Sequence, residues 1–405
     1  MPCSPIASAL LTVLALSLGA SATPRGNAGS AVGKAVYFMT NDGENAVVAV
    51  PIRADGKLSG GTQTSTGGRG SVSIDGAMNA PAAKDGLVSQ SSLSIAGNHL
   101  FAVNAGSNTV SMFAIDAKNP SRLALVGKPA AVPGEFANTV AASAKNAMVC
   151  VGTTGAKAGI SCANFDARAG IGNMDRLREL DIEQSTPPVG PTNTLSQVFW
   201  SNDGTMLFAT VKGDPDKNKT GFLSTFATQQ SAGNGATRLS GQDARSSPKG
   251  TAVLFGSLPI PKTSNIFATD ASFGGSILSV GRKGQASLAA AQPIDGQKAT
   301  CWVTISAVRN TAFVTDVGTP KLVEMSLDDA SIVGTADLSS TGATGMIDLE
   351  AAGNFVYVLA PGDGKTKTQV LVVRAGGGQR VEAIQQFDAG VLGAGARSQG
   401  MVVLG

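Results

Sequence analysis

HLFAVNAGSNTVSMFAI, residues 99–115, consists of two apolar, strand-like segments joined by Ala-Gly-Ser-Asn. The segments are rich in Val, Phe and other residues that favour strands, and the residues between them suit a tight reversal of the chain. The stretch therefore predicts a β-hairpin. Its first half recurs along the whole chain.

Seven segments share the pattern of residues 99–104, and their starts lie 44 to 63 residues apart. The third residue is aromatic in six of the seven, although aromatic residues make up only 5% of the chain. The spacing fits four-stranded propeller blades with loops of variable length. The seven segments are VYFMTN (36–41), HLFAVN (99–104), AMVCVG (147–152), MLFATV (206–211), NIFATD (265–270), TAFVTD (311–316) and FVYVLA (355–360).

Another strand-like segment precedes every copy except the first, and the chain ends on an unassigned strand, SQGMVVLG (398–405). This last strand can supply the missing inner strand of the first blade, which would leave no open sheet edge in the ring. We predict an all-β fold, a seven-bladed β-propeller of four-stranded antiparallel blades, closed by Met401–Leu404. Because the period is irregular, a pair of β-sandwich domains stays open as the alternative.

The first residues resemble a secretion signal. An apolar run, IASALLTVLALSLGA (6–20), is followed by small residues at Ala20 and Ala22. We predict a signal peptide over 1–22, a linker over 23–32 and one propeller domain over 33–405, with a membrane anchor as the alternative at the N-terminus. The protein is then secreted or displayed at the cell surface.

Secretion predicts oxidised thiols and an accessible glycosylation site. Cys150 and Cys162 flank a Gly-rich hairpin loop at equal distances along the sequence, so they would lie opposite each other. This spacing predicts a cross-strand disulfide. Cys301 is left over and is expected to be a buried, small apolar residue. Asn218 begins the sequon Asn-Lys-Thr, which predicts a glycoprotein.

Composition argues against several partners. The net charge is +3 with 15% charged residues and no run of Lys or Arg, so we expect no nucleic acid partner and no membrane span. The segment DPDKN (214–218) starts like a calcium loop, but Lys219 and Thr225 stand where Gly and Glu are required. We expect no metal and no cofactor, and a monomer that binds a small anionic molecule or a cell-surface ligand.

The repeat HLFAVNAGSNTVSMFAID (99–116) resembles the blade of the lactonase family of seven-bladed propellers. Residues 146–166 and 185–226 resemble the secreted fungal proteins known as 3-carboxymuconate cyclase-like. The resemblance implies an isomerase or lactonase acting on a small carboxylated substrate. The stretch VGPTNTLSQ (189–197) departs from the family, because Thr192 and Asn193 stand where Arg-His is expected. A non-enzymatic surface glycoprotein that uses the propeller face for binding or adhesion therefore stays open.

The loops that enter the inner strands share one face of a propeller, the default place for a ligand. Glu135 and Lys212 are the candidate acid and base on this face, since no histidine is available there. The candidate ligand-binding residues are Gln90, Asn138, Asn193, Gln197, Lys249 and Arg397. The charged residues of these loops are Arg69, Lys84, Arg245, Lys249, Lys298 and Arg397 against Asp75, Asp85, Glu135, Asp243 and Asp295.

His99 is the one histidine of the chain. It occupies the first position of a repeat strand, where the other copies have unrelated residues. The turn before it belongs to the face opposite the loops just described. We therefore expect His99 to start a strand and to have no catalytic role.

Overall fold

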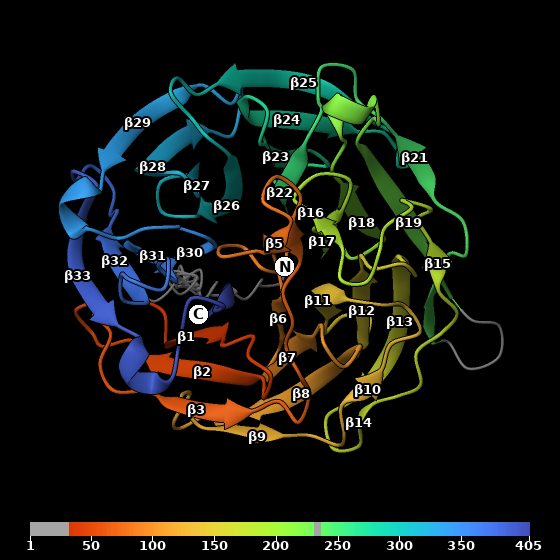
Figure 1. Ribbon diagram of the computed structural model, residues 1–405, viewed down its shortest axis with the longest axis horizontal. Helices are drawn as coiled ribbons and strands as arrows, with labels where there is room; N and C mark the ends of the chain where they lie inside the picture. Colours follow the sequence, from red (N-terminus) through yellow and green to blue (C-terminus); the bar gives the residue numbers. More distant parts are fainter. Residues whose placement is uncertain (1–31, 231–235) are drawn as a thin grey trace, which may run out of the picture.

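The computed structural model describes residues 32–230 and 236–405. Within them, seven sheets of four or five strands stand around a central axis, and a separate three-stranded sheet lies at one end of that axis (Figure 1). The predicted signal peptide 1–22 and the linker as far as residue 31 lie outside the described residues. The arrangement is an all-β propeller.

Each blade begins at the axis and ends at the rim of the ring. The innermost strands are β34 (Gln399–Leu404), β6 (Leu93–Ala96), β11 (Ala137–Ser143), β17 (Leu195–Trp200), β22 (Leu254–Pro259), β26 (Thr300–Ser306) and β30 (Leu349–Ala352). The second strands are β1 (Ala35–Met39), β7 (His99–Asn104), β12 (Met148–Thr153), β18 (Met206–Val211), β23 (Ile266–Asp270), β27 (Thr311–Asp316) and β31 (Phe355–Ala360).

The outer half of each blade is less regular. The third strands are β2 (Ala46–Pro51), β8 (Thr109–Ile115), β13 (Gly159–Asp166), β19 (Phe222–Gln230), β24 (Gly274–Val280), β28 (Thr319–Ser326) and β32 (Gln369–Arg374). The rim strands are β3 (Thr62–Ser65), β9 (Leu123–Leu125), β10 (Ala130–Ala131), β14 (Gly170–Ile171), β15 (Arg178–Glu179), β20 (Thr237–Leu239), β21 (Ala244–Ser246), β25 (Ala286–Pro293), β29 (Ile332–Asp337) and β33 (Glu382–Asp388). Three 3-10 turns complete the described elements: η1 (Pro215–Lys217), η2 (Ser339–Thr341) and η3 (Gly390–Leu392).

The repeat pattern of the sequence corresponds to the second strand of every blade. Its third residue is buried in all seven copies: Phe38, Phe101, Val149, Phe208, Phe267, Phe313 and Tyr357. Burying a large apolar side chain contributes about 1.5–3 kcal/mol. In six blades the second strand also contacts the inner strand of the next blade, so the same apolar position is needed repeatedly.

The last strand closes the ring. β34 pairs antiparallel with β1, with Ala35 opposite Leu404 and Tyr37 opposite Val402. Lys34 N also donates to Leu404 O at 2.7 Å. Each innermost strand contacts the next around the axis, from β6 through β30 to β34 and back to β6. The predicted closure by the C-terminal strand is confirmed.

The third blade contains the predicted disulfide. Cys150 of β12 lies directly opposite Cys162 of β13, and the two sulfurs are bonded. Cys301 is free and buried, as expected.

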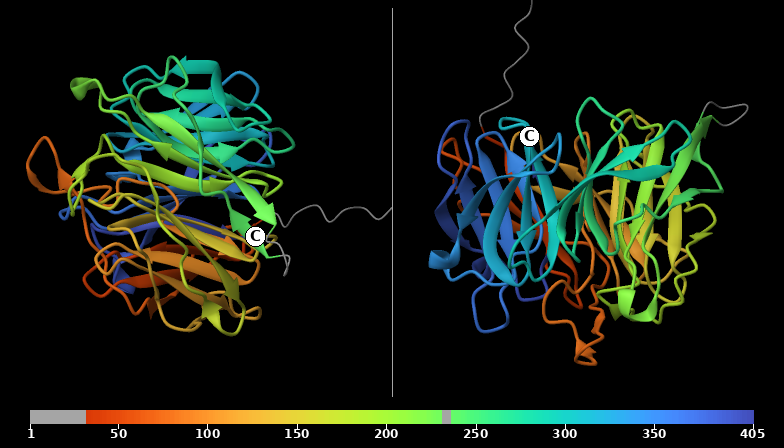
Figure 2. Two further views of the ribbon diagram at one scale, coloured as in Figure 1. Left: turned by 90° about the vertical axis from the view of Figure 1, so that its right-hand side faces the viewer. Right: turned by 90° about the horizontal axis from the view of Figure 1, so that it is seen from above.

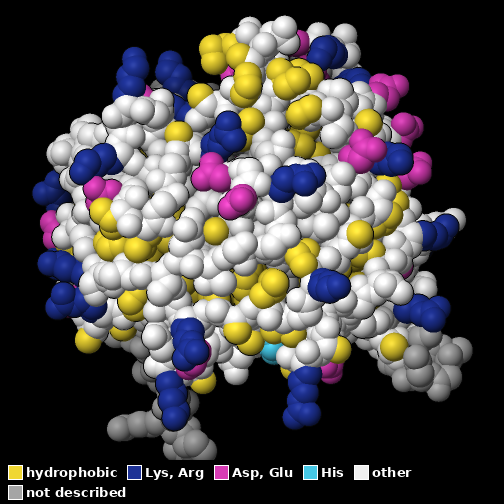
Figure 3. All heavy atoms as spheres, turned by 60° about the horizontal axis from the view of Figure 1, so that its bottom comes forward, with side chains coloured by type: hydrophobic (Ala, Val, Ile, Leu, Met, Phe, Trp, Pro, Cys, Tyr) yellow, Lys and Arg dark blue, Asp and Glu magenta, His cyan; other side chains and the backbone are white. Residues whose placement is uncertain are grey.

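The small sheet joins β4 (Ile74–Asp75), β5 (Ala80–Pro81) and β16 (Val189–Gly190). The β4–β5 hairpin projects from one face of the ring (Figure 2). Hydrophobic side chains gather on the projection at the top of Figure 3, and Met78 at the hairpin tip is 65% exposed. On the face drawn there, Lys and Arg are interspersed with Asp and Glu. Among the described residues, no helix is long and apolar enough to cross a membrane.

Candidate active site

Residues 85–91 cross the axis at the face that carries the β4–β5 hairpin. The segment makes hydrogen bonds to inner strands on different sides of the ring: Gln90 Nε2 donates to Val303 O of β26, and Ser89 Oγ donates to Asn138 O of β11. Asp85, Val88 and Ser91 have φ values of 48°, 50° and 62°. Such backbone angles are unfavourable for a β-branched residue such as Val88, so the surrounding hydrogen bonds must hold the crossing in place.

Three of the predicted ligand-binding carboxamides support this crossing segment. Gln90 accepts from Val303 N at 3.1 Å and donates to Val303 O at 2.8 Å. Asn138 Nδ2 donates to Leu87 O and Leu195 O, and Gln197 Nε2 donates to Ser91 Oγ. All three side chains are buried. Apart from Asn138 Oδ1, which has no partner, their polar atoms bond to the chain itself. A buried backbone segment without sheet partners needs such donors and acceptors.

The other predicted ligand-binding residues lie apart from the crossing. Asn193 Nδ2 donates to Ile182 O within a loop. Lys249 and Arg397 are exposed. None of the three lines the cavity described next.

A cavity of about 390 Å³ lies between the β4–β5 hairpin and the loops at the mouths of three blades. The hairpin and its flanks supply one wall, and the starts of β22 and β26 supply the opposite wall. Five of its twenty lining residues have polar or charged side chains, if Cys301 is counted as apolar. The lining residues are Ser73, Ile74, Asp75, Met78, Ala82, Ala83, Lys84, Asp85, Val88, Gly190, Pro191, Lys212, Val253, Phe255, Ala271, Ala299, Cys301, Trp302, Val317 and Gly318.

Lys212 is fully buried at the end of β18 and lines this cavity. Its Nζ donates to Val88 O at 2.6 Å and contacts Ser196 Oγ at 3.3 Å. It also lies 4.4 Å from the centre of the Phe255 ring. An ammonium has three N–H groups, so one is left for a ligand. Burial lowers the pKa of Lys212 to about 8, and the nearby Asp85 carboxylate opposes that shift.

Asp85 is the acidic partner of Lys212. Its side chain accepts from Ser89 N at 3.3 Å and lines the same cavity. Burial raises the pKa of Asp85 to about 7, against the opposing effects of Lys212 and the backbone N–H groups of Ser89 and Val88. A carboxyl group with such a pKa can accept a proton near neutral pH, which an ordinary surface Asp does poorly.

Two further side chains of the cavity have different roles. Ser73 is buried, and its Oγ has no hydrogen-bond partner in the structure. Cys301 is buried at the start of β26, and burial raises the pKa of its thiol well above the usual value. A thiol of raised pKa is a poor nucleophile, so Cys301 does not fit the role of attacking group.

Glu135, the other predicted catalytic residue, lies outside the cavity lining. Its Oε2 accepts from Thr186 Oγ1 at 2.6 Å, and its Oε1 is 3.8 Å from Lys157 Nζ. The structure therefore brings Lys212 together with Asp85 and not with Glu135. In the sequence, Asp85 is only one of eleven charged residues in the loops predicted for this face. The one available signal was its place in the long segment between the first two blades.

His99 occupies the first position of β7, as expected, directly after the turn at Gly97 and Asn98. Its ring is 6.4 Å from the ring of Phe165. It does not line the cavity.

Two more acids lie along the axis. Asp348 accepts from Met401 N at 3.0 Å, and Glu350 of β30 accepts from Thr304 Oγ1 at 3.2 Å. Burial raises the pKa of Asp348 well above its usual value and that of Glu350 to about 8. In the described residues, no group of three or more His, Cys, Asp or Glu side chains could hold a metal ion.

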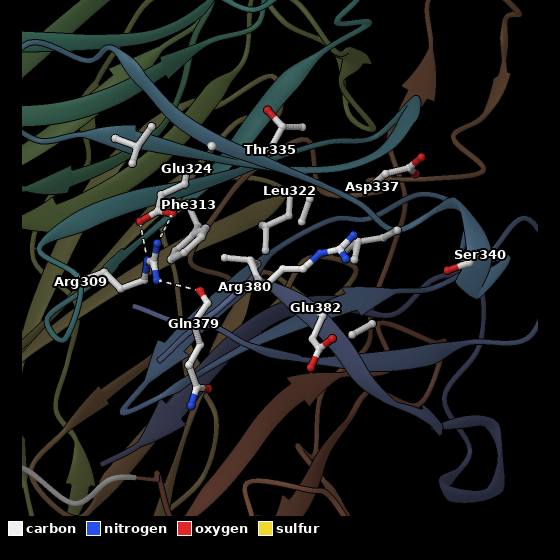
Figure 4. A pocket seen from close by; sticks show the side chains of 16 residues that line it. Arg309, Phe313, Leu322, Glu324, Thr335, Asp337, Ser340, Gln379, Arg380 and Glu382 are labelled. Atoms are coloured by element: carbon white, nitrogen blue, oxygen red, sulfur yellow. Dashed lines mark hydrogen bonds and ion pairs between the residues drawn. The ribbon is translucent and has the colours of Figure 1, made fainter. Parts of the chain in front are cut away.

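A larger cavity, of about 560 Å³, lies at the rim between β29 and β33 (Figure 4). Three of its five charged side chains are already paired. Arg309 binds Glu324 through two contacts of 2.6 and 2.8 Å and also donates to Gly376 O, and Glu382 is 3.0 Å from Arg374. Arg309 and Glu324 are engaged with each other here, whereas Asp85 and Lys212 have pKa values shifted toward neutrality and face one cavity. The cavity at the axis is therefore the candidate site.

Comparisons with known proteins support the fold. No protein-family model matches the chain, and a search of curated proteins finds no significant match. The periplasmic gluconolactonase of Pseudomonas aeruginosa matches with a TM-score of 0.63 at 13% identity, over 91% of this chain and 99% of that one. A putative 6-phosphogluconolactonase from Bacteroides uniformis matches with a TM-score of 0.60 at 11% identity, over 91% and 100%.

A second putative 6-phosphogluconolactonase, from Bacteroides fragilis, matches with a TM-score of 0.59 at 11% identity, over 92% of this chain and 98% of that one. The chain is thus a β-propeller of the kind found in gluconolactonase-like proteins. At these identities the likeness concerns the fold. None of the three structures is a 3-carboxymuconate cyclase, and that part of the resemblance stays a prediction.

Proposed function

We propose that this chain is a divergent lactonase-family hydrolase that opens a small cyclic ester in the cavity beneath the β4–β5 hairpin. The observation that carries the proposal is the buried pair Asp85 and Lys212, which face one cavity and have pKa values shifted toward neutrality. Perturbed groups of this kind in a cleft are a mark of active sites. The fold shared with gluconolactonase-like proteins supports the same reaction class.

In the proposed reaction, Asp85 takes a proton from a water molecule as the water oxygen bonds to the ester carbonyl carbon. The carbonyl electron pair moves onto oxygen, next to the remaining N–H of Lys212. The intermediate then collapses, the ring C–O bond breaks, and the leaving alkoxide takes the proton back from Asp85. One water is consumed and a hydroxy acid is released. The oxyanion contact with Lys212 corresponds to the electrostatic stabilisation used by many acyl-transfer enzymes.

Cyclisation of a carboxymuconate is less well supported than lactone hydrolysis. A substrate with several carboxylates needs several converging cations. The cavity lining contains Lys84 and Lys212 together with Asp75 and Asp85, so its formal charges balance. A neutral ester suits such a lining better than a polyanion.

The test compares Asp85→Asn with Glu135→Gln, a matched acid-to-amide change on the same face outside the cavity. With a racemic panel of γ- and δ-lactones, we expect Asp85→Asn to lower kcat/KM by about 10²- to 10⁴-fold, the usual contribution of a general base. Glu135→Gln should keep wild-type activity. Wild-type protein that opens no lactone would refute the proposal, as would full activity in Asp85→Asn.

A non-catalytic binding role is the second candidate, and the crossing segment 85–91 favours it. The segment covers the axis, and its Leu87 O and Ser91 Oγ accept from the buried carboxamides of Asn138 and Gln197. Binding of intact lactone by wild-type protein without any turnover would support this role.

We also infer that the protein acts outside the cytoplasm. The Cys150–Cys162 disulfide supports this placement, because such bonds persist in oxidising compartments. Asn218 is exposed next to η1, which is compatible with a glycan there. Recovery of the protein from the culture medium, with a mass that falls on Asn218→Gln, is the expected result in a host that performs N-glycosylation.

A further inference from the structure

The cavity beneath the β4–β5 hairpin offers few polar groups to a substrate. Its walls are mainly apolar, and Phe255 and Trp302 form an edge-to-face pair with ring centres 5.0 Å apart on the inner side. Resting on the proposed ester hydrolysis, we infer that the substrate is a lactone carrying an alkyl or aryl substituent, and not a polyhydroxylated sugar lactone.

Apart from Lys84, whose aliphatic stem lies beside Gly345, the free polar groups match one ester. Two N–H groups of Lys212 bond to the protein, so the third can donate to the carbonyl oxygen, and Asp85 can accept a hydrogen bond from the attacking water. Ser73 Oγ is buried without a partner and lines the same cavity, so it can donate to the ring oxygen. Asp75 is already used, because its Oδ1 accepts from Ala77 N and Met78 N in the hairpin turn.

A sugar lactone would place several hydroxyl groups against these walls. Each hydroxyl would lose its bonds to water without a protein partner, which disfavours binding strongly. An alkyl chain gives up no hydrogen bonds to water when it enters the cavity, and each buried methylene improves binding by about fourfold. The lining therefore selects for an apolar substituent.

The hairpin supplies the outer wall for that substituent. Ile74, Met78, Ala82 and Ala83 all line the cavity from this side, and Met78 is 65% exposed. A flexible, unbranched methionine can close over ligands of different shape. A chain extending from the lactone ring toward the hairpin would cover Met78.

The first experiment measures kcat/KM for δ-gluconolactone, δ-valerolactone, δ-decalactone and dihydrocoumarin, corrected for spontaneous hydrolysis. We expect δ-decalactone or dihydrocoumarin to exceed both δ-valerolactone and δ-gluconolactone by at least about tenfold, the effect of roughly two well-buried methylenes. Faster turnover of δ-gluconolactone would overturn the inferred substrate class and leave the hydrolase proposal standing. Turnover of none of the four would instead overturn the hydrolase proposal.

The second experiment tests the hairpin wall with Met78→Ser, and Val391→Ser is the matched control. Val391 is also an exposed apolar residue, at 75%, but it lies in η3. Met78→Ser should lower kcat/KM for δ-decalactone about threefold or more and leave δ-valerolactone unchanged, whereas Val391→Ser should change neither. An unchanged preference in Met78→Ser, or an equal loss for both lactones, would show that the substituent does not lie under the hairpin.

Discussion

At the scale of single residues, the candidate site depends on two opposite charges that burial makes easy to neutralise. Removing a charge from water costs several kcal/mol, and a nearby opposite charge repays only part of it. Asp85 and Lys212 therefore move toward each other in pKa, to about 7 and about 8. In the ionised pair, the carboxylate can accept a proton and the ammonium can stabilise an anion.

The first prediction concerns the pH dependence of activity. Asp85 must be ionised to act as a base, so kcat/KM should rise with pH up to about 7. Lys212 must be protonated to stabilise an oxyanion, so kcat/KM should fall above about 8. The expected profile is a narrow bell. In Lys212→Met the remaining activity should lack the alkaline limb. A bell of unchanged shape in that variant would exclude Lys212 as its cause.

The second prediction concerns stability and Glu350. Its pKa is raised from 4.5 to about 8 in the folded protein, so the fold favours the neutral acid. The stabilisation is complete below pH 4.5 and is lost as the pH rises through 8. Wild-type protein should therefore have a falling Tm between pH 5 and pH 8. Glu350→Gln imitates the neutral acid and should reduce that fall.

The control for Glu350→Gln is Glu382→Gln, which changes an exposed acid on β33 of the same blade. It should keep the wild-type dependence of Tm on pH. A part of the fall should persist in Glu350→Gln, because Asp85 and Asp348 also have raised pKa values. An identical slope in wild type and Glu350→Gln would contradict the assignment.

At the scale of elements, the crossing segment 85–91 explains why the site could not be derived from the sequence. Lys212 and Val88 are 124 residues apart in the sequence, and only the crossing brings Val88 O to Lys212 Nζ. Three of the four predicted carboxamides, Gln90, Asn138 and Gln197, lie near the axis, and Asn193 does not. Their side chains make hydrogen bonds with the crossing segment and the inner strands, which no local sequence pattern indicates. The Cys150–Cys162 pairing was predictable, since a hairpin register is a local property.

The third prediction tests the crossing segment through Gln90. This side chain binds both N and O of Val303, as a neighbouring strand would. Gln90→Ala leaves two buried backbone groups unpaired and should lower the free energy of unfolding by about 2–4 kcal/mol. Gln386→Ala, on the exposed side of β33, should change it by less than about 0.5 kcal/mol. Denaturant titration measures the free energy of unfolding of both variants. Equal values for Gln90→Ala and Gln386→Ala would show that the segment does not depend on Gln90.

At the scale of the whole molecule, the fold was predictable because one buried position is repeated. The aromatic third residue of each second strand has the same task in every blade, and repetition makes a weak local signal strong. The closing strand was predictable from a count of the strand-like segments. The first repeat has no such segment before it, and the last segment of the chain belongs to no other blade. The rim strands vary in number and length from blade to blade, and the small sheet β16–β4–β5 has no counterpart among the other described strands. No sequence period could therefore reveal them.

The fourth prediction tests the closure of the ring. Deleting residues 398–405 removes β34 and exposes an edge of β1 and the flanks of β6 and β30. Met401, which is 1% exposed, is lost with it. The truncated protein should aggregate or lose its cooperative thermal transition, because an unpaired strand edge and an open apolar seam both favour association.

A permuted chain separates loss of the strand from loss of the chain end. Leu404 lies opposite Ala35 in the antiparallel pair, and Lys34 N reaches Leu404 O at 2.7 Å. Residues 398–405 can therefore be moved ahead of Lys34 and joined to it by a short Asn-Gly turn, which suits a two-residue hairpin. We expect this permutant to regain a single sharp melting transition and the lactone turnover of the parent. A truncated protein that melts like the full chain, or a permutant that stays aggregated, would mean that β34 does not hold the ring together.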